Sequence, residues 1–304
     1  MKKNRIGSSD LHATEIGFGC MSLSNNQLEN EKIIHEAIDR GVNYFDTADL
    51  YEFGANEESV GKALKGKRQD VILASKGGNE WGTGIDGWRW NPSKEHLKNA
   101  VKDSLKRLQT DYLDLYQLHG GTIDDPIDET IEAFEDLVKE GTIRYYGISS
   151  IRPNVIKEYA TRSNIVSVMM QYSLLDRRPE ELFSLLNDHT ISVIARGPVA
   201  KGLLAHDYER KLSDEGYLNY NRDELTQTIK KLEKVAKEEH MNLNELALRY
   251  VLGSQTVACT VPGASEVAQV EGNILATQVN NLSPDTIEFL QTITKESQYD
   301  KHRE

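Results

Sequence analysis

Four polar side chains follow apolar, strand-like stretches of this chain, and together they could move a proton. Asp46 and Tyr51 stand five residues apart after one such stretch, and Lys76 and His119 each follow another. An acid, a phenol, an amine and an imidazole are therefore expected where successive buried strands meet a surface. Side chains at the carboxyl ends of neighbouring parallel strands lie close together, which is the layout of an active site.

The chemistry available to such a group is proton donation to an oxygen. A tyrosine keeps its proton at neutral pH and can give it to a substrate oxygen that gains negative charge. The ammonium of Lys76 would favour the resulting phenolate, and Asp46 would hold the buried lysine in place. The imidazole of His119 could hydrogen-bond the same substrate oxygen and orient it.

Each of these residues also has a structural explanation when it is taken alone. Asp46, which is followed by Thr47, could cap a turn or a helix. Tyr51 could belong to the core or its rim, Lys76 to the surface, and His119 to a structural hydrogen bond. Their joint placement after successive strands favours the catalytic interpretation.

The elements that must position these residues alternate along the chain. After a β-hairpin over residues 4–15, we expect strands at residues 16–19, 43–45, 71–75, 112–118, 143–148, 166–171, 191–195 and 258–261. We expect helices at residues 29–40, 57–64, 94–108, 127–140, 153–160, 179–187, 224–239, 243–252 and 284–295. Eight alternating strands predict an α/β fold, a (β/α)₈ TIM barrel with an N-terminal β-hairpin and extra helices.

No linker rich in Pro, Gly or Ser divides the chain, so a single domain over residues 1–304 is expected. Two insertions, at residues 77–92 and 197–221, fall after strand ends, on the face where barrel enzymes hold their sites. Cys20 and Cys259 are expected at different heights of neighbouring strands in a closed barrel. We therefore expect two free thiols.

Charge and hydropathy narrow the classes of partner. A formal net charge of −12 and a pI near 5.2 argue against nucleic acid or an anionic membrane as a partner. The first residues carry no signal peptide, and no stretch approaches the length of a membrane span. We therefore expect a cytoplasmic protein that acts on a small molecule, and the sequence does not specify its oligomeric state.

Short motifs carry a family resemblance. They are FDTADLY around Asp46 and Tyr51, LASK ending at Lys76, LDLYQLH ending at His119, and then GISS, QYSLLDR and VPGA. In this order, over nearly the whole chain, they resemble the aldo-keto reductase family. The resemblance implies NADP(H)-dependent reduction of an aldehyde or ketone, with Asp46, Tyr51, Lys76 and His119 as the catalytic tetrad.

The resemblance also implies which residues would bind the cofactor. Those for the carboxamide would be Ser149, Ser150 and Gln171, with Arg196 stacked on the nicotinamide. The diphosphate would be bound by Gly197, Pro198, Val199, Lys201, Gly202 and Leu203, and the adenosine phosphate by Gly263, Ser265, Gln269 and Asn273. The family more often has an Asn where Ser150 stands, and an aromatic residue where Arg196 stands.

The choice between NADP(H) and NAD(H) is less well specified. No Lys or Arg occurs between residues 250 and 294, where relatives that prefer the 2′-phosphate often have one. NADP(H) is favoured by the resemblance, and NAD(H) is not excluded. A Rossmann fold is not indicated, because the chain has no GxGxxG motif.

On the substrate side, Met21, Phe53 and Trp81 are candidates for contact. All three tryptophans, Trp81, Trp88 and Trp90, fall in the insertion at residues 77–92. They could form a mobile aromatic wall over the substrate, or they could only anchor the loop to the barrel.

Two other functions fit a barrel of this kind. One is a binding or regulatory subunit that senses the cofactor, which an intact tetrad argues against. The other is a hydrolase that uses Asp46, Glu52, Glu57 and Glu58, with or without a metal. No HxH or HExxH pair is present, so no metal site is expected.

Overall fold

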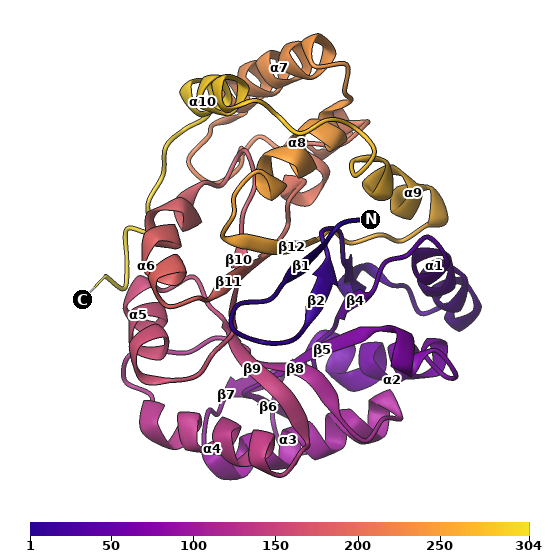
Figure 1. Cartoon of the computed structure of the whole chain (residues 1–304), viewed down its shortest axis with the longest axis vertical. Helices are drawn as coiled ribbons and strands as arrows, with labels where there is room; N and C mark the ends of the chain where they lie inside the picture. Colours follow the sequence, from indigo (N-terminus) through magenta and orange to yellow (C-terminus); the bar gives the residue numbers. More distant parts are fainter. Residues whose placement is uncertain (304) are drawn as a thin grey trace.

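The computed structural model describes residues 1–303, in which eight parallel strands form the barrel (Figure 1). In sheet order they are β3 (Phe18–Gly19), β4 (Tyr44–Asp46), β5 (Ile72–Gly77), β8 (Leu113–Leu118), β9 (Ile143–Ser149), β10 (Ser167–Gln171), β11 (Ser192–Arg196) and β12 (Val257–Val261). Parallel bridges from Ile16 to Thr260 and from Gly19 to Gly263 join the first strand to the last. The predicted TIM barrel is confirmed.

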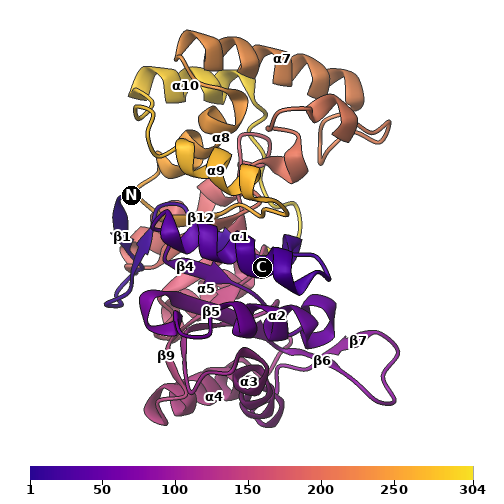
Figure 2. The same ribbon diagram turned by 90° about the vertical axis from the view of Figure 1, so that its right-hand side faces the viewer.

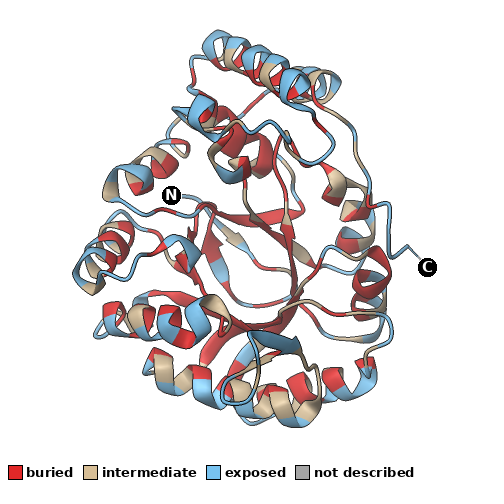
Figure 3. Ribbon diagram, turned by 180° about the vertical axis from the view of Figure 1, so that it is seen from behind, coloured by how far each residue is buried: buried red, intermediate tan, exposed pale blue. Residues whose placement is uncertain are grey.

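Helices lie around the barrel (Figure 1). They are α1 (Gln27–Asp39), α2 (Ala55–Ala63), α3 (Lys94–Leu108), α4 (Ile127–Lys139), α5 (Pro153–Arg162), α6 (Phe183–Asp188), α7 (Arg222–Glu238), α8 (Leu243–Leu252), α9 (Val267–Leu275) and α10 (Pro284–Ile293). Figure 3 shows buried residues on the strands and inner helix faces, and exposed residues outside. This distribution is what the amphipathic sequence pattern of these helices predicts.

Local sequence sets the helix ends. The side chain of Asn221 accepts from the backbone N–H of Glu224, whose carboxylate accepts from the backbone of Asn221 in return, so α7 begins with a capping box. Asn242 and Glu245 do the same for α8. One expected helix, at residues 179–187, is instead a 3₁₀ turn at Arg178–Leu182 followed by the short α6.

The expected N-terminal hairpin is present, and it closes one end of the barrel. β1 (Lys3–Arg5) and β2 (His12–Thr14) pair in antiparallel fashion, and Ile6 packs into the cluster of side chains inside the barrel. The Asn4 side chain donates a hydrogen bond to the carbonyl of Ala258 at 2.9 Å. Because this end is covered (Figure 1), the carboxyl ends of the strands form the open end.

The insertion after β5 forms a second hairpin, which the sequence did not predict. β6 (Asn79–Trp81) pairs with β7 (Trp88–Trp90) in antiparallel fashion, and the hairpin projects from the body of the protein (Figure 2). The Trp90 indole N–H donates to Asp125 at 2.9 Å. Its ring lies over Gly78, where a Cβ would come within 2.9 Å of it. Trp90 therefore anchors the base of the hairpin.

The insertion after β11 lies beside the C-terminal segment at the open end of the barrel. It contains two 3₁₀ turns, η5 (Ala200–Gly202) and η6 (Tyr208–Lys211). Beyond α10, the backbone N–H of Lys295 donates to the Tyr220 hydroxyl at 2.5 Å, so the two segments are joined. Figure 2 shows α7 and α10 stacked at one side of the barrel.

Two smaller expectations concern the cysteines and the membrane. Cys20 and Cys259 are both buried and free, as the barrel geometry predicted. In residues 1–303, no helix has both the length and the apolar character that crossing a bilayer requires.

Candidate active site

Three neighbouring strands bring the predicted catalytic side chains together. Asp46 is the last residue of β4, Lys76 lies near the end of β5, and His119 directly follows β8. Tyr51 begins the 3₁₀ turn η2 (Tyr51–Gly54) after β4. Since β4, β5 and β8 are adjacent in the sheet, all four residues meet at its carboxyl edge.

The Lys76 ammonium is the centre of this group. Its Nζ lies 2.5 Å from Oδ1 of Asp46, 3.1 Å from the hydroxyl of Tyr51 and 2.8 Å from the carbonyl oxygen of Thr47. Lys76 is fully buried and Asp46 is 4% exposed. Each of the three ammonium protons therefore has an oxygen acceptor, which is the condition for keeping a charged lysine inside a protein.

Burial and pairing act against each other on these charges. Burial favours the neutral lysine, but the Asp46 carboxylate opposes it, and the net result is a raised pKa for Lys76. Burial raises the pKa of Asp46, while Lys76 and a 3.3 Å hydrogen bond from Gln117 act in the other direction. The arrangement holds an ammonium next to the Tyr51 hydroxyl.

His119 is neutral at physiological pH. Burial, with the nearby cations Lys76 and Arg196 acting in the same sense, lowers its pKa to about 3. Its ring meets the Tyr51 ring edge to face, with the centroids 5.8 Å apart. Its Nδ1 is buried with no hydrogen-bond partner in residues 1–303. A neutral imidazole beside a phenol can donate or accept one hydrogen bond without adding charge.

The turn that presents Tyr51 has an unusual backbone. Glu52 and Phe53 have φ of 49° and 50°, and Gly54 has φ of 89°. Left-handed backbone is strained for residues other than glycine and clusters at functional sites. The Thr47 hydroxyl donates to Asn56 at 2.7 Å, and Asn56 donates to the Cys20 carbonyl at 2.8 Å, so the turn is held at its base.

A cavity of about 1980 Å³ opens over the tetrad and runs across the strand ends toward α9. The predicted residues that line it are Met21, Asp46, Tyr51, His119, Ser149, Ser150, Gln171, Arg196, Gly197, Pro198, Val199, Lys201, Gly202, Gly263, Ser265, Gln269 and Asn273. Lys76 lies behind Tyr51, and Leu203 is buried beside the cavity and does not line it. The structure thus gathers the predicted tetrad and most of the predicted cofactor residues around one space.

Two of the three candidate substrate residues lie elsewhere. Phe53 and Trp81 do not line the cavity; their rings contact each other, with centroids 5.8 Å apart. The Arg107 guanidinium lies 5.4 Å from the Trp81 ring centroid. The turn at Tyr51 and the β6–β7 hairpin direct both rings to each other instead of over the tetrad.

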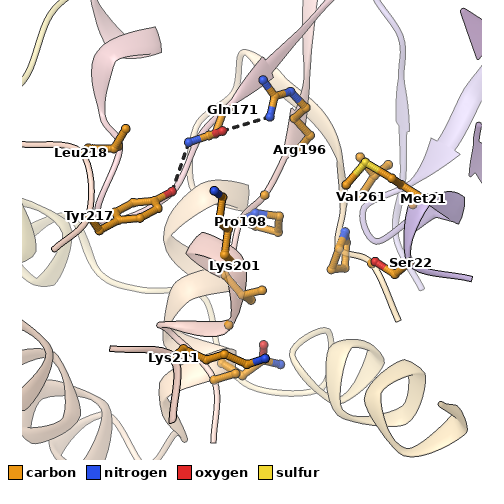
Figure 4. Close-up of a pocket in the computed structure, with 18 of the residues that line it drawn as sticks. Met21, Ser22, Gln171, Arg196, Pro198, Lys201, Lys211, Tyr217, Leu218 and Val261 are labelled. Carbon is orange, nitrogen blue, oxygen red and sulfur yellow. Dashed lines mark hydrogen bonds between the residues drawn. The ribbon is translucent and has the colours of Figure 1, made fainter. Parts of the chain in front are cut away.

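A polar network lies at the inner end of the cavity (Figure 4). Arg196 donates from Nη1 to the side-chain oxygen of Gln171 at 3.0 Å. The Gln171 amide donates to Asp176 at 3.0 Å and to the hydroxyl of Tyr217 at 3.1 Å. Both amide protons of Gln171 are thus used, and its oxygen keeps one lone pair free.

Sequence reasoning missed Asp176 and Tyr217 in this network. Asp176 is fully buried and paired with Arg178 at 2.7 Å, and it stands within the QYSLLDR motif. That motif could have pointed to Asp176 as a partner of Gln171. No signal could have found Tyr217, because it lies 46 residues from Gln171 in an irregular insertion.

The loop after β11 has a backbone suited to an anion. Gly197, Ala200, Lys201 and Gly202 all have positive φ, between 48° and 90°. Successive backbone N–H groups in such conformations form concave anion sites. Lys201 and Lys211 also line the cavity, and neither makes an ion pair within residues 1–303. The backbone N–H groups of this loop, the two lysines and the extent of the cavity therefore suit a long molecule with a diphosphate in its middle.

Comparison with known proteins agrees with the fold. The model of the aldo/keto reductase family matches residues 15–295. The solved holo form of aldo-keto reductase AKR11C1 from Bacillus halodurans is 56% identical over 100% of both chains, with a TM-score of 0.94. The "uncharacterized oxidoreductase YqkF" of Bacillus subtilis is 54% identical over 100% of both chains.

A more distant relative is the "aldo-keto reductase yakc [NADP(+)]" of Schizosaccharomyces pombe, 29% identical over 93% of this chain and 88% of that protein. The fold is a (β/α)₈ barrel with an Asp, a Tyr, a Lys and a His gathered at its open end, and the relatives place it among the oxidoreductases. This chain belongs to the aldo-keto reductase family.

Proposed function

We propose that this protein reduces the carbonyl group of an aldehyde or ketone with NADPH, reversibly, and that Tyr51 supplies the proton. The observation that carries the proposal is the contact of the buried Lys76 ammonium with both Asp46 and the Tyr51 hydroxyl at the inner end of the cavity. In this proposal the substrate is a small carbonyl compound and the protein works in the cytoplasm.

Bound NADPH supplies the hydride, which goes to the carbonyl carbon. The residues of this chain would then handle the negative charge on the carbonyl oxygen. Tyr51 gives its hydroxyl proton to that oxygen, and the Lys76 ammonium, 3.1 Å away, stabilises the phenolate that remains. Asp46 keeps Lys76 charged and in place, and Tyr51 regains a proton from solvent.

His119 would orient the substrate. Because its imidazole is neutral, it can donate one ring N–H to the carbonyl oxygen without a formal charge. A donor placed where negative charge develops is typically worth about 10²–10³ in rate. The edge-to-face contact of His119 with Tyr51 puts both groups beside the same point of the cavity.

The cavity residues support a nicotinamide dinucleotide as the hydride source. The free lone pair of Gln171 and the hydroxyls of Ser149 and Ser150 suit a carboxamide. The left-handed backbone at residues 197–202 suits a diphosphate, and the loop at residues 263–273 suits the adenosine end.

We favour NADP(H) over NAD(H). The loop at residues 263–273 has no cation, but the insertion after β11 brings Lys201 and Lys211 into the cavity wall. A relative that carries NADP(+) in its name belongs to the same family. Lysines without carboxylate partners would attract the additional phosphate, so both cofactors should be compared directly.

The carboxylates of the alternative hydrolase function are not gathered in one place. Of Asp46, Glu52, Glu57 and Glu58, only Asp46 lines the cavity. Glu57 is buried and bound by the Ser75 hydroxyl at 2.5 Å and by Arg107 at 2.7 Å. Within residues 1–303, these four acids therefore do not form a pair of carboxylates at the cavity wall.

The test is a titration of the purified protein with NADPH and, separately, with NADH, followed by an aromatic aldehyde. The absorbance of the reduced nicotinamide is followed at each stage. We expect oxidation in the wild type and a loss of turnover of at least about 10³ in Tyr51→Phe, with cofactor binding retained. Tight binding without turnover on a broad set of carbonyls would support a cofactor-sensing subunit instead.

A further inference from the structure

Arg196 is a cation of the cavity wall that makes no ion pair within residues 1–303. The ammonium of Lys76 is paired with Asp46, and the guanidinium of Arg178 is paired with Asp176. Arg196 makes no ion pair in residues 1–303, and its hydrogen bond goes to the neutral amide oxygen of Gln171. With the imidazole of His119 nearby also neutral, the guanidinium of Arg196 keeps its charge without an ion-pair partner.

This cation stands next to the place where hydride transfer must occur. Arg196 ends β11 directly beside Gln171 of β10, and both side chains line the cavity (Figure 4). If the carbonyl oxygen accepts a proton from Tyr51, the position of the carbonyl carbon is set as well. The hydride donor must then be in contact with that carbon. Gln171 and Arg196, at the ends of β10 and β11, would therefore be the residues beside the hydride-donating ring.

We propose that Arg196 makes this site bind the reduced nicotinamide cofactor more tightly than the oxidised one. The inference rests on the proposed function, since it requires a nicotinamide in the cavity. The reduced ring is neutral, whereas the oxidised ring carries a positive charge that the guanidinium repels. A planar guanidinium can also stack on a ring, so the residue can face the nicotinamide closely.

The reaction generates the charge that Arg196 opposes. A hydride leaves the reduced ring with two electrons, the carbonyl carbon gains it, and the Tyr51 proton completes the alcohol. The ring is left with one positive charge beside a guanidinium. Oxidised cofactor is consequently released readily after each turnover, and it competes weakly with NADPH when both are present.

The test measures binding alone, in the absence of any carbonyl compound. Dissociation constants for NADPH and NADP⁺ are determined by calorimetry for the wild type, Arg196→Met and Arg196→Lys. We expect the wild type to bind NADPH at least about tenfold more tightly than NADP⁺, and the Arg196→Met variant to lose about tenfold of that preference. Arg196→Lys keeps the charge and is expected to keep the preference.

A nicotinamide-free probe separates charge repulsion from general damage. The compound 2′-phosphoadenosine 5′-diphosphoribose is expected to bind all three proteins equally, because it does not reach Arg196. A wild type that binds the two cofactors equally overturns the inference without any variant. So does an unchanged preference in Arg196→Met, or an Arg196→Lys variant that behaves like Arg196→Met.

The same experiment distinguishes failure of the inference from failure of the proposed function. If the wild type binds neither cofactor, both are wrong. If the wild type oxidises NADPH with an aldehyde but its preference does not depend on the charge at residue 196, only the inference about Arg196 is wrong.

Discussion

The contact between Lys76 and Asp46 is the strongest electrostatic feature of the site at the scale of single residues. Both side chains are almost fully removed from solvent, and their charged atoms lie 2.5 Å apart. Removing one partner of a buried pair leaves the other charge without compensation. The pair should therefore couple stability to activity.

We predict that Lys76→Met destabilises the protein by about 3–5 kcal/mol, because Asp46 would lose its cation. The double variant Lys76→Met with Asp46→Asn should recover part of that loss, since no charge remains buried. Urea denaturation followed by tryptophan fluorescence measures both. A single variant as stable as the wild type, or a double variant that costs the sum of the two single ones, would contradict the pairing described here.

Residue types and spacing were enough to predict that the four side chains of the proposed tetrad lie together, because each stands at the end of a strand or in the turn that follows one. The partners of Gln171 were not predictable in the same way, since Tyr217 approaches it only after folding. Phe53 and Trp81 were expected to face the substrate. Their positions depend on a left-handed turn and a projecting hairpin, and the sequence pattern indicates neither.

At the scale of elements, the segment after β4 is supported from behind by a buried acidic pair. Asp49 is 2% exposed, and its burial, with the Glu57 carboxylate acting in the same sense, raises its pKa to about 8. Arg107 of α3 and Lys76 of β5 oppose this shift. Glu57 belongs to α2. Charged side chains from α2, α3 and β5 therefore surround Asp49, in the segment that leads to Tyr51.

We predict that the stability of Asp49→Asn, relative to that of the wild type, increases as the pH rises. A carboxyl whose pKa is raised by folding contributes stability that is complete below its unfolded pKa, near 4, and is lost as the pH rises toward 8. Asparagine does not titrate. The variant should therefore gain about 4 kcal/mol relative to the wild type between pH 5 and pH 8. Chemical denaturation at both pH values measures this, and a pH-independent difference would refute it.

The insertion after β11 is attached to the cofactor region by Tyr217, whose hydroxyl accepts from Gln171. Tyr217→Phe removes this hydrogen bond and keeps the ring. One such bond is worth about 1 kcal/mol, so NADPH should dissociate about fivefold faster from the variant. Stopped-flow displacement measures the rate, with Tyr112→Phe on the distant surface as the matched control. Equal rates in all three proteins would mean that Tyr217 does not hold the insertion closed over the cavity.

Most helices and core strands were predictable from the sequence, because the spacing of apolar residues and the capping residues indicate the same boundaries. The expected range of α3, for example, matches the observed Lys94–Leu108. The β6–β7 hairpin was not, since its strands are three residues long and largely exposed. The helix expected at residues 179–187 is divided at Leu182, where a 3₁₀ turn ends and α6 begins, and Pro179 stands in the first turn, where a proline is tolerated.

At the scale of the whole molecule, one end of the barrel is covered and the other is open. The N-terminal hairpin fills the amino end, and the two long insertions and the C-terminal segment surround the carboxyl end. Although the chain has a net charge of −12, the cavity wall collects Arg196, Lys201 and Lys211. An anionic cofactor, as we propose, would therefore meet local positive charge on an acidic protein.

The most direct test of the account follows the hydride itself. The protein is incubated with an aldehyde and NADPH deuterated at C4 on the transferred face, and the alcohol product is examined by mass spectrometry. We predict one deuterium on the alcohol carbon in the wild type, and essentially no alcohol in Tyr51→Phe. Alcohol without deuterium from either C4-deuterated form of NADPH, or undiminished alcohol from Tyr51→Phe, would contradict the proposed mechanism.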